Sequence, residues 1–406
     1  SITRELTNLD DMFSYDNLDR LTNDSHQTTI YGYDKLGNRT SKQVGINIPT
    51  SYTIDNNSNR LLHVGNAKAR QYDANGNTTA PPDLGSLGMQ YNQANRMSKY
   101  ATKSLPYDVF YYHNGIGQRI RKHKGDNDFV YIYDEQGQLI HESKYGPPEV
   151  GFGEDHLWDK EIIWLNNRPV AVIETTYSSP TLTQEIYYIQ TDHLNTPRWI
   201  TDDAGLRIWS WESDAFGTTL PNEDVDGDGT DFEFNLRFPG QYYDNESGFH
   251  YNYFRDYEPG TGRYLESDPI GLYGGVNTYG YVNGSPISFE DSFGLRLICV
   301  LPTVDPRGNY NPFTNTFSPR PGCDKRIWLP KKPTKCSYWN PATMSWVRRE
   351  CPEDTEKRDK MLYLEDCNRQ KWKCNKDFLD NIVFITISPG PKKITPFEHA
   401  DIFFYR

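Results

Sequence analysis

The chain has 406 residues, which is enough for two or three domains. Hydrophobic residues are only 36% of the chain while aromatic residues reach 14%, so sheets with one solvated face fit better than a packed helical core. No apolar run is long enough to span a membrane, which excludes a protein built from transmembrane helices. The chain begins at Ser1 without a charged and apolar leader, so we expect a fragment or a processed chain.

The formal net charge of −12 is unevenly distributed along the chain. Residues 296–406 hold 20 Lys and Arg against 13 Asp and Glu, whereas residues 1–295 hold 23 against 42. All six cysteines lie beyond residue 295. An acidic body therefore carries a basic tail, and we expect two differently built modules that meet near Leu295.

An internal repeat occupies residues 1–141. Each copy starts with a Tyr and continues through Asp, Asn or Gly, often to an Arg, and the spacing of about 18 to 21 residues fits two short strands and a turn. We predict β-hairpins whose Asn/Asp-Gly pairs supply the positive φ angles of a two-residue turn. Repetition favours structural roles for these residues. We expect the Tyr rings to cover the sheet, Asp to lie in the turn and Arg to pair with that Asp. The copies start at Tyr15, Tyr33, Tyr52, Tyr72, Tyr91, Tyr112 and Tyr133.

Longer strands and Trp residues follow in residues 142–234. His193 stands beside Asp192, but no nucleophile shares the motif, so we favour a hydrogen-bonded structural histidine over a catalytic one. Turns are expected at Asn166–Asn167 and at Asp203–Gly205. Strands are predicted at Ile162–Leu165, Pro169–Ile173, Glu185–Ile189 and Arg207–Trp211.

An acidic loop within this region has the spacing of a calcium site. Asp224, Asp226 and Asp228 alternate, and Gly residues permit the bend. The twelfth position, where an EF-hand has Glu, is Asn235, with Glu233 two residues earlier. Either the segment Asp224–Asn235 binds an isolated Ca²⁺ ion, or it is a solvated acidic turn.

Residues 235–295 combine Tyr, Phe and Asn with closely spaced Gly and Pro. Two similar turns, Asp268–Leu272 and Asp291–Leu295, lie within this segment. The stretch resembles the RHS-repeat-associated core of bacterial Rhs and Tc-type toxins, and the repeats of residues 1–141 resemble their YD repeats. The resemblance covers most of residues 1–295 and none of the tail. It implies a mainly β fold, in which hairpins wind into a hollow shell, followed by a variable toxin domain.

The resemblance also implies a self-cleaving aspartyl peptidase. The candidate acids are Asp268 and Asp291, Arg263 is the orienting cation, and the cut falls between Leu295 and Arg296. Two neighbouring carboxylates can share one proton, so that one activates water while the other donates to the carbonyl. The alternative is that these Asp-Pro and Gly-Leu pairs only make turns. Ser292 stands where the family usually has Pro. This difference favours the alternative that the plug does not cut the chain.

Residues 296–406 contain no repeat, and we expect a small cysteine-rich α+β domain. Residues 353–380 have helix-like apolar spacing, and residues 381–387 read as a buried strand. Glu398, His399 and Asp401 are candidate toxin residues, although a solvated turn explains them equally well. Six cysteines without a CxxC pair favour disulfides of unknown pairing over zinc. They are Cys299, Cys323, Cys336, Cys351, Cys367 and Cys374.

The resemblance as a whole implies a secreted antibacterial or insecticidal toxin whose shell encloses a C-terminal effector and releases it by self-cleavage. The alternative is a non-catalytic encapsulation or cell-surface binding scaffold with an uncleaved tail. Expected partners are the chain's own shell repeats, a secretion spike or toxin-complex component, and an immunity protein that binds residues 296–406. Disulfides would place the toxin domain in an oxidising space such as a periplasm. Its target and activity are not predicted.

Overall fold

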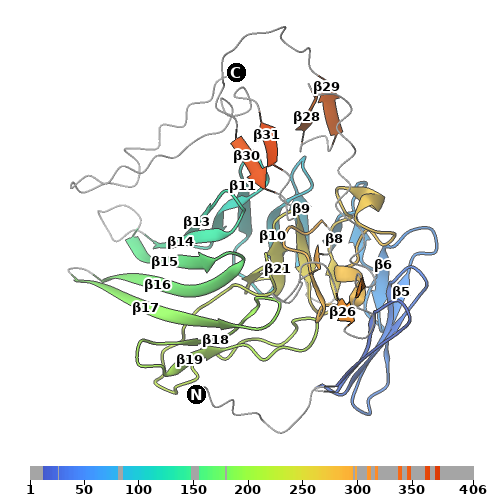
Figure 1. Ribbon diagram of the computed structural model, residues 1–406, viewed down its shortest axis with the longest axis horizontal. Coiled ribbons are helices and arrows are strands. Elements are labelled where there is room, and N and C mark those ends of the chain that lie inside the picture. Colours follow the sequence, from blue (N-terminus) through green and yellow to red (C-terminus); the bar gives the residue numbers. More distant parts are fainter. Residues whose placement is uncertain are drawn as a thin grey trace. The chain divides into compact units, whose positions relative to one another are not determined.

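The computed structural model describes residues 12–25, 27–80, 86–147, 155–178 and 181–295, and the backbone of short strand pairs beyond residue 295. The chain divides into two compact units, Ser1–Asp324 and Lys325–Arg406. Strands dominate, and the only helical segments among the described residues are two short 3-10 turns, which confirms the mainly β fold (Figure 1). No helix in the described part of the chain is long and apolar enough to cross a membrane.

A wall of antiparallel strands forms most of the first unit. In each of its sheets every strand pairs only with its neighbours in sequence. The first sheet contains β1 (Phe13–Tyr15), β2 (Leu21–Asp24), β3 (Thr29–Tyr33), β4 (Arg39–Val44), β5 (Thr50–Ile54) and β6 (Leu61–Val64). A separate pair, β7 (Gln71–Tyr72) and β8 (Thr78–Ala80), follows it.

The second sheet of the wall has eleven strands. Its strands at residues 155–191 are the longest of the wall, and they contain three of the four strands predicted in the Trp-rich region; the fourth forms β19. The members are β9 (Ser86–Tyr91), β10 (Met97–Thr102), β11 (Val109–His113), β12 (Arg119–Lys124), β13 (Asn127–Tyr133), β14 (Leu139–Gly146), β15 (Asp155–Leu165), β16 (Arg168–Ser178), β17 (Thr181–Thr191), β18 (Pro197–Thr201) and β19 (Arg207–Ser210).

The turn after each repeat Tyr differs from the predicted two-residue turn. In the second copy, Asp34 Oδ1 accepts the N–H groups of Leu36 and Asn38 at 2.8 and 2.9 Å. Only Gly37 has a positive φ, +83°, and the strand register shifts just before Tyr33 leaves the sheet. The loop is longer than the predicted two-residue turn. It closes through hydrogen bonds to the Asp side chain rather than through a second residue with positive φ. The turn role of Asp is confirmed.

The predicted pairing of repeat Arg with turn Asp holds in one copy and not in the next. Arg20 forms a salt bridge with Asp16 at 2.5 Å. Arg39 lies instead against the rings of Tyr31 and Phe216, with its guanidinium carbon 4.7 and 4.1 Å from the centroids. Aromatic faces stabilise a buried cation without a carboxylate.

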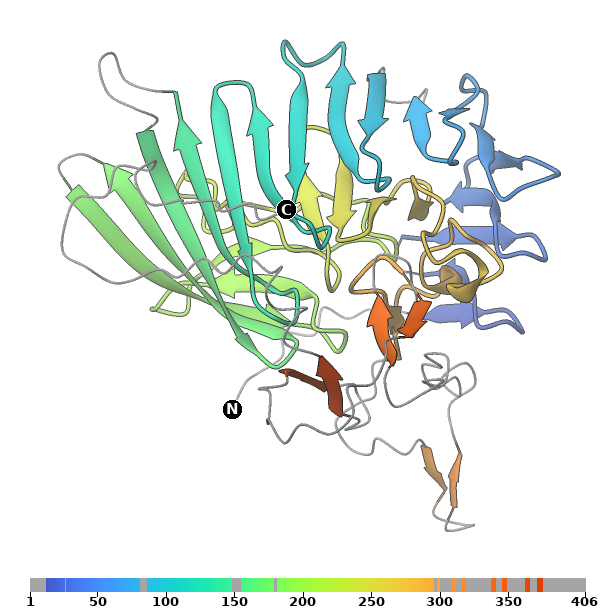
Figure 2. The same ribbon diagram turned by 90° about the horizontal axis from the view of Figure 1, so that it is seen from above.

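Residues 235–295, which we call the plug, pack against the wall. Figure 2 shows the wall strands curving round this segment. Arg70 and Arg119 of the wall bind Glu258 and Asp244 of the plug at 2.7 and 2.6 Å. The plug contains β20 (Tyr242–Asp244), β21 (Phe249–Asn252), β22 (Arg255–Glu258), β23 (Arg263–Tyr264), the 3-10 turns η2 (Gly271–Tyr273) and η3 (Val282–Gly284), and β24 (Phe289–Glu290), which pairs with β25 (Ile298–Cys299).

His193 joins the wall to the plug. Its Nε2 lies 2.8 Å from the carbonyl oxygen of Ile287, which confirms the hydrogen-bonded structural role. The turns that flank the neighbouring strands are also confirmed, because Asn166 and Gly205 have φ angles of +56° and +83°.

Beyond residue 299 the structure describes three strand pairs. They are β26 (Asn309–Asn311) with β27 (Thr316–Ser318), β28 (Ser337–Asn340) with β29 (Ser345–Arg348), and β30 (Leu362–Glu365) with β31 (Lys371–Cys374).

The helix predicted for residues 353–380 is therefore wrong where the structure describes it. β30 and β31 pair so that Leu362 faces Cys374 and Leu364 faces Trp372. In both segments apolar residues alternate with polar ones, which suits a strand, and the longer helical spacing was misleading. The disulfides stay a prediction, because no side chain of this region is described. Cys323, Cys336, Cys351, Cys367, residues 381–387, Glu398, His399 and Asp401 lie outside the described residues.

Candidate active site

The two turns predicted to carry the acids come together in the plug. Asp268 follows β23, and its backbone N–H donates to the carbonyl oxygen of Thr278 at 2.7 Å while Oδ1 accepts the N–H of Ile270 at 2.9 Å. Asp291 follows β24. Both side chains are buried, with exposed residue fractions of 7% and 2%. The structure therefore places these carboxylates at one site although they lie far apart in the sequence.

Arg255 of β22 binds both carboxylates. Its Nη2 lies 3.1 Å from Asp268 Oδ2 and 3.4 Å from Asp291 Oδ2. The same guanidinium donates to the backbone carbonyl oxygens of Thr278, at 3.1 Å, and of Gly294. A planar fork of five N–H donors is suited to holding several acceptors in fixed positions. The cation of the site is thus Arg255.

Arg263, the residue predicted for this role, lies elsewhere. Its guanidinium donates to the carbonyl oxygen of Asn59 in the wall and lies 5.1 Å from the centroid of the Tyr279 ring. Burial lowers the pKa of Arg263 to about 10. Arg263 therefore joins the plug to the wall, and the difference arises because β22 and β23 present their arginines to different neighbours.

Leu295, which precedes the expected cut, bonds Asp291 and lies close to Asp268. Its N–H donates to Asp291 Oδ1 at 2.9 Å. Its carbonyl oxygen approaches Asp268 beside Gly274, where an ideal Cβ would lie 2.6 Å from Leu295 O and 2.2 Å from Asp268 Oδ2. A side chain at residue 274 would therefore collide with both groups, and Gly274 leaves them adjacent.

Tyr264 completes the surroundings of Asp291. Its hydroxyl donates to Asp291 Oδ2 at 2.9 Å and accepts from Asn252 Nδ2 at 2.8 Å. Asn252 Nδ2 also donates to the backbone carbonyl oxygen of Asp291 at 2.9 Å. The Tyr264 ring lies 3.6 Å from the guanidinium carbon of Arg255. One tyrosine thus contacts the cation through its face and an acid through its hydroxyl.

The electrostatics of the site favour a proton on Asp268. Burial raises the pKa of Asp268 to about 6, although Arg255 opposes the rise. Asp291 Oδ1 and Oδ2 receive the hydrogen bonds of Leu295 and Tyr264 described above, and hydrogen bonds of this kind favour a charged carboxylate. The two acids therefore have unequal environments, as an acid and a base require.

A second carboxyl pair lies on the same strands. Glu266 Oε2 accepts the backbone N–H of Asp256 at 2.8 Å, and both residues are buried. Burial raises the pKa of Asp256 to about 6, while burial and the charge of Asp256 raise the pKa of Glu266 well above its ordinary value. The two shifts therefore favour a proton retained by the pair.

The turn at Ser292 is held by its neighbours despite the missing proline. Gly240 has a φ of +81°, and an ideal Cβ there would lie 2.0 Å from the carbonyl oxygen of Ser292. The carbonyl oxygen of Phe293 accepts the N–H of Phe254 at 3.2 Å. An ideal Cβ on Gly294 would lie 2.4 Å from the carbonyl oxygen of Asn252. Close packing thus restrains the backbone that Pro would restrain through φ.

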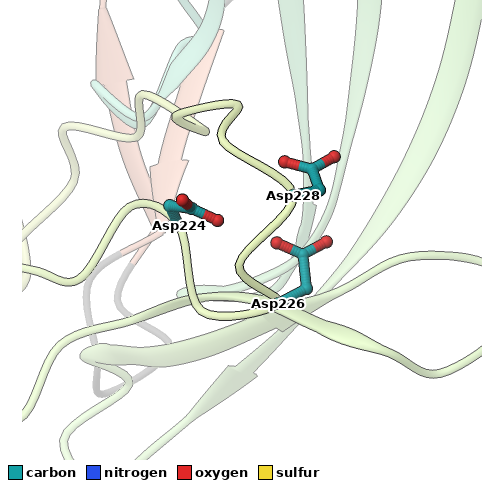
Figure 3. Close-up of side chains that lie close together, drawn as sticks. All are labelled: Asp224, Asp226 and Asp228. Atoms are coloured by element: carbon teal, nitrogen blue, oxygen red, sulfur yellow. The ribbon is translucent and has the colours of Figure 1, made fainter.

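The calcium loop brings together three of its four predicted ligands. Carboxylate oxygens of Asp224, Asp226 and Asp228 lie within 4.8 Å of one another, and Figure 3 shows the three side chains on one loop. Glu233 is not part of this group, because its Oε1 accepts from Asn235 Nδ2 at 3.1 Å. Three carboxylates at this separation repel one another unless a cation binds among them. Calcium binding stays a prediction.

Comparisons with known proteins agree with this architecture, although no family model matches the chain. The chain is 28% identical over 326 residues to the double-stranded DNA deaminase toxin A of Burkholderia cenocepacia, covering 65% of this chain and 22% of that protein. It is 38% identical over 116 residues to the toxin protein Tse5 of Pseudomonas aeruginosa, covering 29% of this chain and 8% of that protein. These matches span less than a quarter of each relative.

The same architecture occurs in solved structures. The crystal structure of TcdB2–TccC3–TEV matches with a TM-score of 0.58 and 20% identity, over 70% of this chain and 15% of that one. The hairpin wall packed against a plug is thus a fold that this chain shares with that structure. Together with the toxin relatives, this likeness supports an Rhs-type polymorphic toxin C-terminal region.

Sequence reasoning grouped Asp268 and Asp291, which the structure places at one site, but missed Arg255, Tyr264 and Gly274. Arg255 stands in the run Tyr251–Tyr257, which is rich in aromatic residues expected to be buried. A buried Arg requires acceptors, and the Asp-containing turns are among the candidates along the chain. The need of a buried Arg255 for acceptors was therefore the signal in the sequence that could have placed it at this site. Nothing in the sequence indicates that Gly274 lies beside Leu295.

Proposed function

We propose that this chain encloses an effector segment and releases it by cutting itself once between Leu295 and Arg296. Residues 1–295 form the shell and plug, and residues 296–406 carry the effector. The observation that supports this most is the position of Leu295, whose N–H bonds Asp291 and whose carbonyl oxygen lies beside Asp268. A turn that served only to reverse the chain has no need of two buried carboxylates around one peptide unit.

The proposed chemistry divides the work between the two acids. Protonated Asp268 donates a hydrogen bond to the carbonyl oxygen of Leu295 and makes its carbon electrophilic. Ionised Asp291 takes a proton from a water molecule, whose oxygen bonds to that carbon. The carbon–nitrogen bond then breaks, the amine of Arg296 takes a proton, and Leu295 ends in a carboxyl group. Arg255 stabilises the ionised acid throughout.

A single turnover is sufficient for this reaction. The bond to be cut is part of the same chain, so no binding step is required and the effective concentration of substrate is high. The cut leaves residues 296–406 free to leave the plug when the shell opens.

The effector's own activity is left open. The two toxin relatives named above have their own activities, and this chain spans only a small part of either. We propose delivery into a target cell as part of a toxin complex or secretion apparatus, with a dedicated immunity protein binding residues 296–406. Disulfides among the six cysteines would suit action in a periplasm, and Glu398, His399 and Asp401 are the first residues to substitute in a toxicity assay.

The test of self-cleavage is the intact mass of the purified chain under denaturing, non-reducing conditions and again after reduction. We expect two species that correspond to residues 1–295 and 296–406, and a gain of mass on reduction if the tail holds disulfides. Asp268→Asn and Asp291→Asn should each leave one uncut chain.

A turn aspartate of the wall provides the matched control. Asp202 Oδ1 accepts the N–H of Leu206 at 2.7 Å, and an ideal Cβ on Gly205 of the same turn has no other atom within 4 Å, so Asp202→Asn removes a turn carboxylate from an open turn of the wall. This variant should be cut as the wild type is. A wild-type chain that stays whole for days would instead favour a non-catalytic encapsulation or cell-surface binding scaffold, with Ser292→Pro as the variant to make next.

A further inference from the structure

The hydroxyl of Tyr264 contacts only one of the two acids. It donates to Asp291 Oδ2 at 2.9 Å, and its oxygen accepts the amide N–H of Asn252 at 2.8 Å. Burial and the charge of Asp291 raise the pKa of Tyr264 well above its ordinary value, so the hydroxyl keeps its proton and acts as a donor. The direction of this hydrogen bond is therefore fixed.

This bond makes the two carboxylates unequal. Arg255 Nη2 forms an ion pair with Asp268 Oδ2 at 3.1 Å and donates a hydrogen bond to Asp291 Oδ2 at 3.4 Å, and the backbone N–H groups of Ile270 and Leu295 donate to Asp268 and Asp291 respectively. The Tyr264 hydroxyl is an additional donor, and it favours the ionised form of the acid that receives it. Arg255 contacts both acids at similar distances, and its hydrogen bond to Asp291 acts in the same direction as that of Tyr264.

We propose that Tyr264 is a positioning residue for self-cleavage, because its hydroxyl keeps Asp291 as the ionised base and so leaves the proton to Asp268. This inference rests on the proposed cut after Leu295 and adds the group that assigns the two acids their roles. Without the hydroxyl, the proton can occupy either carboxylate, and the fraction of chains in the productive state falls.

Tyr264→Phe separates the hydroxyl from the ring. The ring face, 3.6 Å from the guanidinium carbon of Arg255, is retained in Phe, so the cation keeps its support. Only the donor to Asp291 and the acceptor for Asn252 are lost. The substitution therefore tests the hydroxyl rather than the packing.

The plug supplies a matched control in Tyr257. It faces Tyr264 directly across β22 and β23, is equally buried, and donates its hydroxyl to the carbonyl oxygen of Phe216 at 2.8 Å. Tyr257→Phe therefore removes one buried hydroxyl hydrogen bond from the same sheet, away from the acids. Any loss of stability common to both variants appears in this control.

The experiment follows full-length chains made by cell-free translation, with synthesis stopped and the samples shifted to buffers between about pH 4 and pH 9. Cleavage after Leu295 is timed on denaturing gels. Because a hydrogen bond lowers the pKa of the acid that accepts it, its loss should move the acidic limb of the rate profile upward by about 1 pH unit. At the acidic limb the rate should fall about tenfold relative to Tyr257→Phe.

Stability is measured separately in the uncut Asp268→Asn background, where the unfolding midpoints of the two Phe variants are compared. If Tyr264→Phe does not fold, Asn252→Ser is used, because it removes the amide that orients the Tyr264 oxygen and should shift the limb in the same direction. A cut wild type with the same rate and pH profile in Tyr264→Phe and Tyr257→Phe overturns the role of Tyr264 alone. An uncut wild type overturns the proposed function itself.

Discussion

The carboxylate of Asp268 and the carbonyl oxygen of Leu295 meet where the Cβ of residue 274 would otherwise lie. Gly274 has a φ of −80°, which any residue adopts, so its backbone conformation does not require glycine. The requirement comes from space, because an ideal Cβ would lie 2.2 Å from Asp268 Oδ2 and 2.6 Å from Leu295 O. In the proposed reaction, the small hydrogen atom at this position is what lets Asp268 reach the carbonyl group of Leu295.

Gly274→Ala should therefore slow cleavage by about 100-fold, since an ångström of displacement at the reacting groups is enough for a loss of this size. The rate is measured by the translation time course. Gly280→Ala is the control, because the nearest atoms to its ideal Cβ, all from Asn277, are 3.4 Å away. Cleavage of Gly274→Ala at the wild-type rate would show that the observed contact is not the reactive one.

The two plug arginines should respond differently to the same substitution. Arg255→Lys keeps the charge but loses the fork that spans two carboxylates and two carbonyl oxygens, so we expect cleavage to slow by about 10- to 100-fold. Arg263→Lys should be cut at close to the wild-type rate and unfold more easily, because its hydrogen bond is to Asn59. The opposite order of rates would restore Arg263 as the orienting cation.

Cleavage should slow as the pH rises through about 6. Burial disfavours the charged form of Asp268, which raises its pKa to about 6 and keeps the proton on the acid below that pH. Above it the donor is lost, and the rate should fall about tenfold for each further pH unit. A profile that is flat from pH 6 to pH 9 would mean that Asp268 is not the proton donor.

Calcium should stabilise the loop of Asp224, Asp226 and Asp228. If the ion binds only the folded chain, a 100-fold excess over its dissociation constant adds about 2.7 kcal/mol to the free energy of unfolding. Thermal unfolding with and without Ca²⁺ measures this, in the wild type and in Asp226→Asn. Asp231→Asn is the control, since Asp231 is outside the group. An equal response of all three chains would indicate a solvated acidic turn.

The sequence predicted the wall well because its signals are local. Short runs of apolar residues placed three of the four Trp-region strands inside β15, β16 and β17, and the Asp of each repeat turn was recognised from its spacing. The turn length was wrong because Asp34 can close a longer loop with its side chain, and the Asn/Asp-Gly pair alone does not distinguish the two forms.

The candidate site was only half predictable because it depends on register. Asp268 and Asp291 carry a recognisable motif, but Arg255 reaches them only because Asn252 and Arg255 face each other across the tight β21–β22 hairpin. Arg255 and Arg263 both stand near the motif, and composition does not tell which one meets the acids. The pairing of strands decides it.

The order of the strands has a consequence for how the toxin is made. Wall strands pair with their neighbours in sequence, so each hairpin can form as soon as it leaves the ribosome. The ion pair between Arg70 of the wall and Glu258 of the plug forms only after Glu258 has been synthesised. Asp291 and Leu295 are the last parts of the plug to be synthesised. If the chain cuts itself there, cleavage can occur only after the wall and the plug have folded. An effector that follows a misfolded wall then stays covalently attached to it.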